Sequence, residues 1–132
     1  MRFKLIRHII ATPFIWAMII PVAFADLLIE IYHRVCFPLY DIPYVRRSEY
    51  IRIIDRYKLP YLNLGEKLGC AYCGYVNGWL HYASIIAART EQYWCGIAHL
   101  EERGYRAPAH ETNFTPYGDE VAFRKRYLLK DD

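Results

Sequence analysis

The apolar positions of the N-terminal quarter form one long stretch. Between Ile9 and Ala25 the sequence carries no charged residue, and as a helix this run spans about 25 Å, the low end of a bilayer crossing. Asp26 then appears, yet apolar residues continue at helical spacing as far as Val35. We therefore predict a membrane anchor that continues as an interfacial helix. Together they cover residues 1–35, with the second part at the level of the lipid headgroups.

The same segment also fits a cleavable secretory signal. A basic start and an apolar core precede the small-residue pattern Ala23-Phe24-Ala25. A retained anchor is favoured because the apolar pattern does not stop at Ala25, and because Trp16 and two prolines are unusual in a signal core. Basic residues flank the anchor on both sides, so the positive-inside rule does not choose an orientation.

A connector rich in proline and aromatic residues follows at residues 36–61. Proline removes backbone donors and blocks helix, so the part up to Arg47 is expected to be extended. The part from Ser48 to Leu59 fits either a short strand or an amphipathic helical turn, and its period does not decide between them. We expect the connector to lie along the membrane surface or along the folded domain.

Helical patterns return after Pro60. Asn63 is a candidate N-cap with Glu66 as its capping-box partner, and this first helix is predicted to reach Leu68. A second, longer helix is expected to begin at Asn77 and to stop at Gly104, since glycine favours the C-terminal cap of a helix.

These patterns divide the rest of the chain into two parts. Residues 62–105 are predicted to form a small helical domain. Residues 106–132 are predicted to form a loop-rich tail, because proline and glycine recur there, with a short final helix at residues 119–129. The predicted fold class is mainly α: an N-terminal transmembrane or interfacial helix followed by a small helical domain.

Composition favours a membrane over nucleic acid as the partner. Hydrophobic residues make up 55% of the chain, which contains 13 tyrosines and 3 tryptophans. Amphipathic aromatic rings are common at membrane interfaces and on partner surfaces. The formal net charge of +3 is small for a protein that binds phosphate backbones. We expect the lipid bilayer and a membrane protein or complex as partners, and no nucleic acid.

Two short clusters carry the candidate chemistry. Cys70 and Cys73 form a C-x-x-C pair before a glycine, which predicts a metal-binding knuckle, and Cys95 and His99 lie one helical turn apart. Three thiolates and one imidazole complete a tetrahedral shell for Zn²⁺. Such a closed shell is typical of a structural site, which here would staple the small helical domain. Thiolate sites persist best in a reducing compartment, which favours the cytoplasmic side.

Other interpretations of these residues stay open. Two disulfides would employ Cys36 as well, but they leave His99 without a role. Iron, as in a rubredoxin-like site or an iron–sulfur cluster, would use the same four ligands as zinc. Glu91 lies one turn before Cys95, where it fits an outer-shell acceptor for the histidine, an additional ligand, or a surface carboxylate paired with Arg89.

Both clusters lie within longer motifs. The first is C-x-Y-C-G-Y-x-N-G, within residues 66–78, and the second is T-E-x-Y-W-C-x-I-x-H, at residues 90–99. These motifs, with the segment at residues 31–40, resemble a family of small bacterial membrane-associated proteins of uncharacterised function, and the resemblance covers most of residues 26–105. The family often has proline at the position of Gly96, a difference that concerns the helix and not the ligands. The resemblance implies an anchored bacterial protein that retains the cysteine and histidine ligands, and it implies no activity.

Together these patterns predict a zinc-binding accessory or structural protein. It is anchored in a bacterial inner membrane, with the metal domain in the cytoplasm, and docks on another membrane protein or complex. The first alternative is a one-electron carrier with iron at the same four residues. The second is a metalloenzyme that uses Glu91. Enzyme activity is less expected, because the sequence contains no nucleophile elbow, phosphate loop or dinucleotide fingerprint, and no catalytic residue is predicted.

Overall fold

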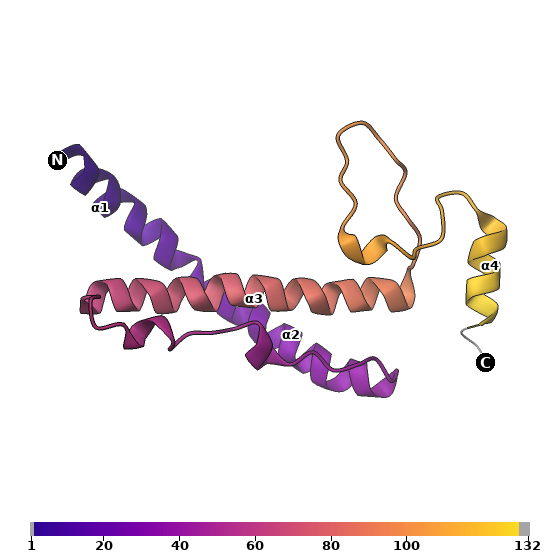
Figure 1. The fold of residues 1–132 in the computed structure, drawn as a ribbon, viewed down its shortest axis with the longest axis horizontal. Helices are drawn as coiled ribbons and strands as arrows, with labels where there is room; N and C mark the ends of the chain where they lie inside the picture. The colour runs from indigo at the N-terminus through magenta and orange to yellow at the C-terminus, as the bar shows by residue number, and fades with distance from the viewer. Residues whose placement is uncertain (1, 130–132) are drawn as a thin grey trace. The chain divides into compact units, whose positions relative to one another are not determined.

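The computed structural model describes residues 2–129, and helices dominate this part of the chain (Figure 1). The long helices are α1 (Arg2–Ala17), α2 (Ile19–Leu39) and α3 (Leu64–Trp94), and α4 (Glu120–Leu128) is short. Three single 3₁₀ turns are η1 (Arg47–Glu49), η2 (Arg56–Lys58) and η3 (Ala109–Glu111). The described residues contain no β-strand, only an isolated bridge between Ile97 and Thr115. The prediction of a mainly α fold is confirmed.

The chain divides into two compact units. Unit 1 is Met1–Ile85 and unit 2 is Ile86–Asp132, and α3 contributes to both. Each unit is described by itself below.

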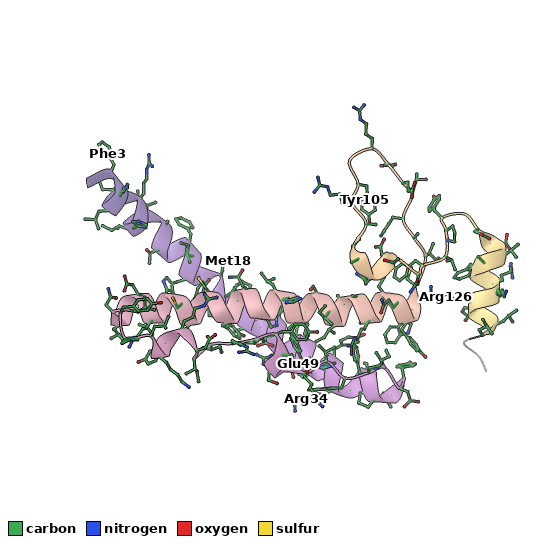
Figure 2. All side chains as sticks on the ribbon, in the orientation of Figure 1. Phe3, Met18, Arg34, Glu49, Tyr105 and Arg126 are labelled. Carbon is green, nitrogen blue, oxygen red and sulfur yellow. The ribbon has the colours of Figure 1, made fainter. Side chains whose placement is uncertain are left out.

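The apolar N-terminal helix of unit 1 is present as predicted. It runs from Phe3 to Leu39, is long and apolar enough to cross a membrane, and is interrupted once at Met18, between α1 and α2 (Figure 2). Pro21 accounts for the break, because it has no N–H to donate to the carbonyl of Ala17. A signal sequence or the core helix of a soluble protein has the same length and composition, but only 11% of the apolar window is buried here.

Helix α3 replaces the two helices that the sequence predicts for this region. Its start is confirmed: the Asn63 side chain accepts a hydrogen bond from the Glu66 N–H, and the Glu66 carboxylate accepts one from the Asn63 N–H, both at 2.9 Å. Asn77 is not an N-cap but lies inside the helix. The predicted stop at Gly104 is also wrong, since α3 ends at Trp94 and the chain turns at Gly96, whose φ is +66°.

The connector explains why the glycines of α3 do not break the helix. It returns from the end of α2 along α3 (Figure 1), and its backbone presses onto Gly74 and Gly78. A Cβ at Gly74 would lie 2.4 Å from the Arg52 carbonyl oxygen, and one at Gly78 would lie 2.7 Å from the Tyr50 oxygen. Gly74, part of the predicted knuckle, is therefore a packing position. The Cys knuckle itself is not shown, since Cys70 and Cys73 are helical.

The core of unit 1 lies where α2, the connector and α3 meet. Its fully buried side chains come from all three segments: His33 and Phe37 from α2, Val45 from the connector and Tyr82 from α3. The ring of His33 stacks on Tyr44 with centroids 4.1 Å apart and meets Phe37 edge-on at 4.6 Å. The core is thus aromatic, and it holds a histidine at its centre.

Unit 2 is tied together by backbone pairing and by one arginine. The Ala98 N–H donates to the Thr115 carbonyl at 2.8 Å, and the Thr115 N–H donates to the Gly96 carbonyl at 2.9 Å. Arg126 of α4 donates to the carbonyls of Gly96, Gln92 and Asn113 at 3.0–3.2 Å (Figure 2). These contacts hold α4 and the loop before it against the end of α3.

Candidate functional sites

A charged network lies at the first polar positions after the apolar run. Arg47 of η1 donates two hydrogen bonds of 2.6 Å to the two carboxylate oxygens of Asp26, which is buried. The same guanidinium lies 3.4 Å from Glu30, one turn further along α2. Two carboxylates and one guanidinium are thus paired inside unit 1. The Arg47–Asp26 pair has the bidentate geometry that makes arginine–carboxylate pairs strong, whereas Glu30 adds one longer contact.

Tyrosines of α3 extend this network to the buried histidine. The Tyr75 hydroxyl donates to Asp26 at 2.6 Å, and the Tyr82 hydroxyl donates to Glu30. His33 Nε2 accepts a hydrogen bond from the Val45 N–H at 3.1 Å, so the ring proton belongs on Nδ1, which lies 3.1 Å from the Tyr82 oxygen. The hydrogen bonds of the network therefore run in one direction, because His33 donates to Tyr82 and Tyr82 donates to the Glu30 carboxylate.

Burial and charge shift the pKa values of the network side chains outside α2. The hydrogen bonds to Asp26 and the nearby carboxylates raise the pKa of Arg47, which keeps it cationic. Burial, and next the hydrogen bond to Asp26, raise the pKa of Tyr75 to about 12. Burial, and next the hydrogen bond to Glu30, also raise the pKa of Tyr82. Both phenols are neutral donors at physiological pH.

A second cluster lies in unit 2 and has the composition of a metal site. Ligand atoms of Glu91, His99 and Glu111 all lie within 4.8 Å of one another. They come from the end of α3, the loop after it and η3, respectively. His99 Nε2 is 3.9 Å from Glu111 Oε1. Among the described residues, this is the one group of histidine, cysteine and acidic side chains that could hold a metal ion.

The surroundings of this cluster hold two of its members in place. His110 Nε2 lies 2.7 Å from Glu91 Oε2, and Gln92 donates to the His110 carbonyl at 3.1 Å. The Glu111 side chain is only 4% exposed, and its Oε2 is buried without a hydrogen-bond partner. Partial desolvation of the nearby Tyr105 hydroxyl raises its pKa although the side chain is exposed, and the negative charges of Glu111 and Glu91 raise this pKa further.

The predicted zinc ligands are distributed along and beyond α3. Cys70 and Cys73 lie in unit 1, inside α3, whereas Cys95 directly follows its end and His99 lies in the loop of unit 2. All four cysteines are free thiols, and Cys73 and Cys95 are exposed. α3 is helical at every position from Cys73 to Trp94. The Cys70, Cys73, Cys95 and His99 site stays a prediction.

The comparisons with known proteins add no relative to this picture. No family model matches the chain, and no curated protein and no solved structure matches it. The resemblance to small bacterial membrane-associated proteins therefore stays a prediction that rests on its motifs alone.

Sequence reasoning identifies two of the three residues of the unit 2 cluster. Glu91 and His99 were named as candidates, and the structure brings them together, but the spacing gave no reason to add Glu111 or His110. The network of unit 1 was missed entirely. Its signal was present in the sequence, since Asp26, Glu30 and His33 interrupt an apolar stripe at spacings of four and three residues, on one face of a helix.

Proposed function

We propose that the protein is a membrane-anchored accessory protein that docks on another membrane protein or complex. The observation that carries the anchor is the exposure of the N-terminal helix. Its apolar window is 11% buried within the chain, whereas the core helix of a soluble protein is mostly buried. Large apolar side chains such as Phe3, Phe14 and Ile20 are exposed. Lipid would cover this surface at no cost to the fold.

The charged network supports an anchor that ends near Asp26. Carboxylates near the end of a membrane segment are costly unless they are paired, and they then face the protein rather than lipid. Asp26 and Glu30 are both paired with Arg47, and the tyrosines of α3 cover them. The charges that would oppose deeper insertion are thus turned inward, toward the connector.

Helix α3 is suited to lie at the interface beside this anchor. The Tyr72 hydroxyl donates to the Ile15 carbonyl, and its ring centroid is 4.6 Å from that of Trp16. From Leu68 to Ala88 the sequence contains no Asp, Glu, Lys or Arg. Tyrosine and tryptophan favour the headgroup region, where one end of the ring is apolar and the other is hydrated.

The docking part of the proposal rests on exposed aromatic side chains. Tyrosine and tryptophan are enriched at the centres of protein interfaces because they bury a large area and lose little rotamer entropy. Large aromatic side chains are exposed in both units, namely Tyr44, Tyr57, Tyr61, Trp94, Tyr105, Tyr117 and Tyr127. Such side chains offer contact area to a membrane-embedded partner.

Cell fractionation followed by a mild-detergent pull-down tests this function. We expect the tagged full chain to stay in the membrane after alkaline carbonate washing, with an intact N-terminus by mass spectrometry, and to retain a membrane protein in stoichiometric amount. Release by carbonate, or a mature N-terminus at Asp26, would overturn the anchor. As a further check, the membranes are crosslinked before extraction. If the chain is then recovered without any partner, the accessory role is overturned.

Orientation and cofactor chemistry are separate parts of the prediction. Inner-membrane location and a cytoplasmic metal domain are proposed with the anchor. Zinc at the four sequence-predicted ligands and iron at the same ligands stay predictions. An absorption spectrum with elemental analysis of the purified protein separates them, because thiolate-bound iron is coloured and zinc is not. The anchor does not depend on either result.

A further inference from the structure

We propose that unit 2 binds a divalent transition-metal ion through Glu91, His99 and Glu111. The three side chains come from three different segments, and their ligand atoms lie within 4.8 Å of one another. Carboxylate oxygens with an imidazole nitrogen suit Zn²⁺, Mn²⁺ and Fe²⁺. This site goes beyond the proposed anchoring function and is independent of it.

The buried Glu111 carboxylate is the independent observation that points to a ligand. Its side chain is 4% exposed, and Oε2 makes no hydrogen bond to any residue that the structure describes. Buried carboxylate oxygens are normally hydrogen-bonded, because an unpaired one loses its hydration without compensation. Oε1 lies 3.9 Å from His99 Nε2, which is longer than a hydrogen bond. A cation between the histidine and the carboxylate would satisfy both groups.

The His99 and Glu111 ligand atoms would need to move slightly closer together on metal binding. Ligand atoms at about 2.0–2.1 Å from zinc lie about 3.3 Å apart in a tetrahedral shell. The 3.9 Å separation between His99 and Glu111 is therefore slightly wider than a loaded site requires. The His99 side chain is 62% exposed and stands in a loop, so it is free to move by this amount.

Charge and the outer shell support the same conclusion. Glu91 and Glu111 are two carboxylates within one small cluster, and like charges at this range repel unless a proton or a cation lies between them. His110, whose Nε2 is 2.7 Å from Glu91 Oε2, orients that carboxylate as outer-shell partners of metal ligands do. Three protein ligands leave at least one coordination position for water or for a further ligand.

Zinc titration of the full chain in detergent, after stripping with a chelator, tests the site. We expect saturable binding of one Zn²⁺, competed by a chromophoric chelator. Glu111→Gln should weaken it by at least about 100-fold, and His110→Ala by about 10–100-fold, the range for an outer-shell contact. Glu102→Gln, which changes an exposed carboxylate in the same loop, is the matched control and should bind as the wild type does.

Cobalt separates this site from the cysteine site, because both would use His99. Co²⁺ bound to carboxylates and imidazole shows no thiolate charge-transfer band, and Cys70→Ser with Cys73→Ser should leave the affinity unchanged. The proposal is overturned if zinc does not bind, if Glu111→Gln binds like the wild type, or if the cysteine double variant loses the ion. Should Glu111→Gln not fold, His99→Ala in the Cys70→Ser and Cys73→Ser background provides the same test, because the cysteine site is already removed there.

Discussion

Removal of the Arg47 guanidinium should destabilise unit 1 more than the loss of any surface charge pair. Arg47→Met keeps the apolar stem but leaves Asp26, whose side chain is 10% exposed, without its charged partner, while the Tyr75 hydroxyl still donates to it. Breaking a fully buried ion pair costs roughly 3–5 kcal/mol. Arg47 is 36% exposed, which lets water reach the site, so we expect a loss of about 2–3 kcal/mol in the free energy of unfolding.

Urea unfolding of the full chain in a mild detergent, followed by circular dichroism, measures this loss. Arg34→Met is the matched control, because Arg34 pairs with Glu30 from a 70% exposed position, and it should unfold close to the wild type. Adding Asp26→Asn to Arg47→Met should recover part of the loss, since an amide left without its partner costs less than a charge. The reasoning is refuted if Arg47→Met unfolds within about 0.5 kcal/mol of the Arg34→Met control, the range of ordinary surface substitutions.

Two further outcomes follow from the packing of α3. Gly78→Ala should destabilise unit 1 by more than about 1 kcal/mol, because its Cβ would lie 2.7 Å from a backbone oxygen of the connector. Gly69→Ala is the control: a Cβ there has nothing within 4 Å, so this variant should be neutral or stabilising. Equal unfolding midpoints of the two variants would contradict the close approach of the connector. Folding raises the pKa of Tyr75 from 10.0 to about 12 and so favours the neutral phenol. The contribution of Tyr75 to the free energy of unfolding should be complete below pH 10 and be lost as the pH rises to about 12. In unfolding curves recorded across that pH range, Tyr75→Phe should show a smaller loss.

Local patterns were sufficient to predict the N-terminal helix and the starts of α3 and α4. An uncharged run has few alternatives to helix, and the Asn63 and Glu66 capping box depends on residues only three positions apart. The same holds for α4, where Asp119 accepts a hydrogen bond from the Ala122 N–H at 2.9 Å. The prediction failed where the tertiary context decides. Gly74 and Gly78 resemble breaks in a helix until the connector is seen to fill the space that they leave.

The candidate sites show the same limit. Glu91 and His99 were selected because they lie near Cys95 in sequence, but Glu111 and His110 reach the cluster only because the loop returns to the end of α3. The pairing of Asp26 with Arg47 spans the whole connector, and no short-range pattern encodes it. A C-x-x-C pair, conversely, is a local signal. Within a helix it places two sulfurs on one face, but it does not determine where any further ligand lies.

Lipid protection of position 14 tests the central claim most directly. Phe14 is 73% exposed in the protein, so a cysteine there would react with a membrane-impermeant maleimide unless lipid covers it. In a chain whose four native cysteines are replaced by serine, we predict that Phe14→Cys in opened native membranes reacts only after solubilisation in sodium dodecyl sulfate. Glu102→Cys should react without it, once the vesicles are opened. Equal labelling of the two positions in opened membranes, before solubilisation, would contradict the anchor.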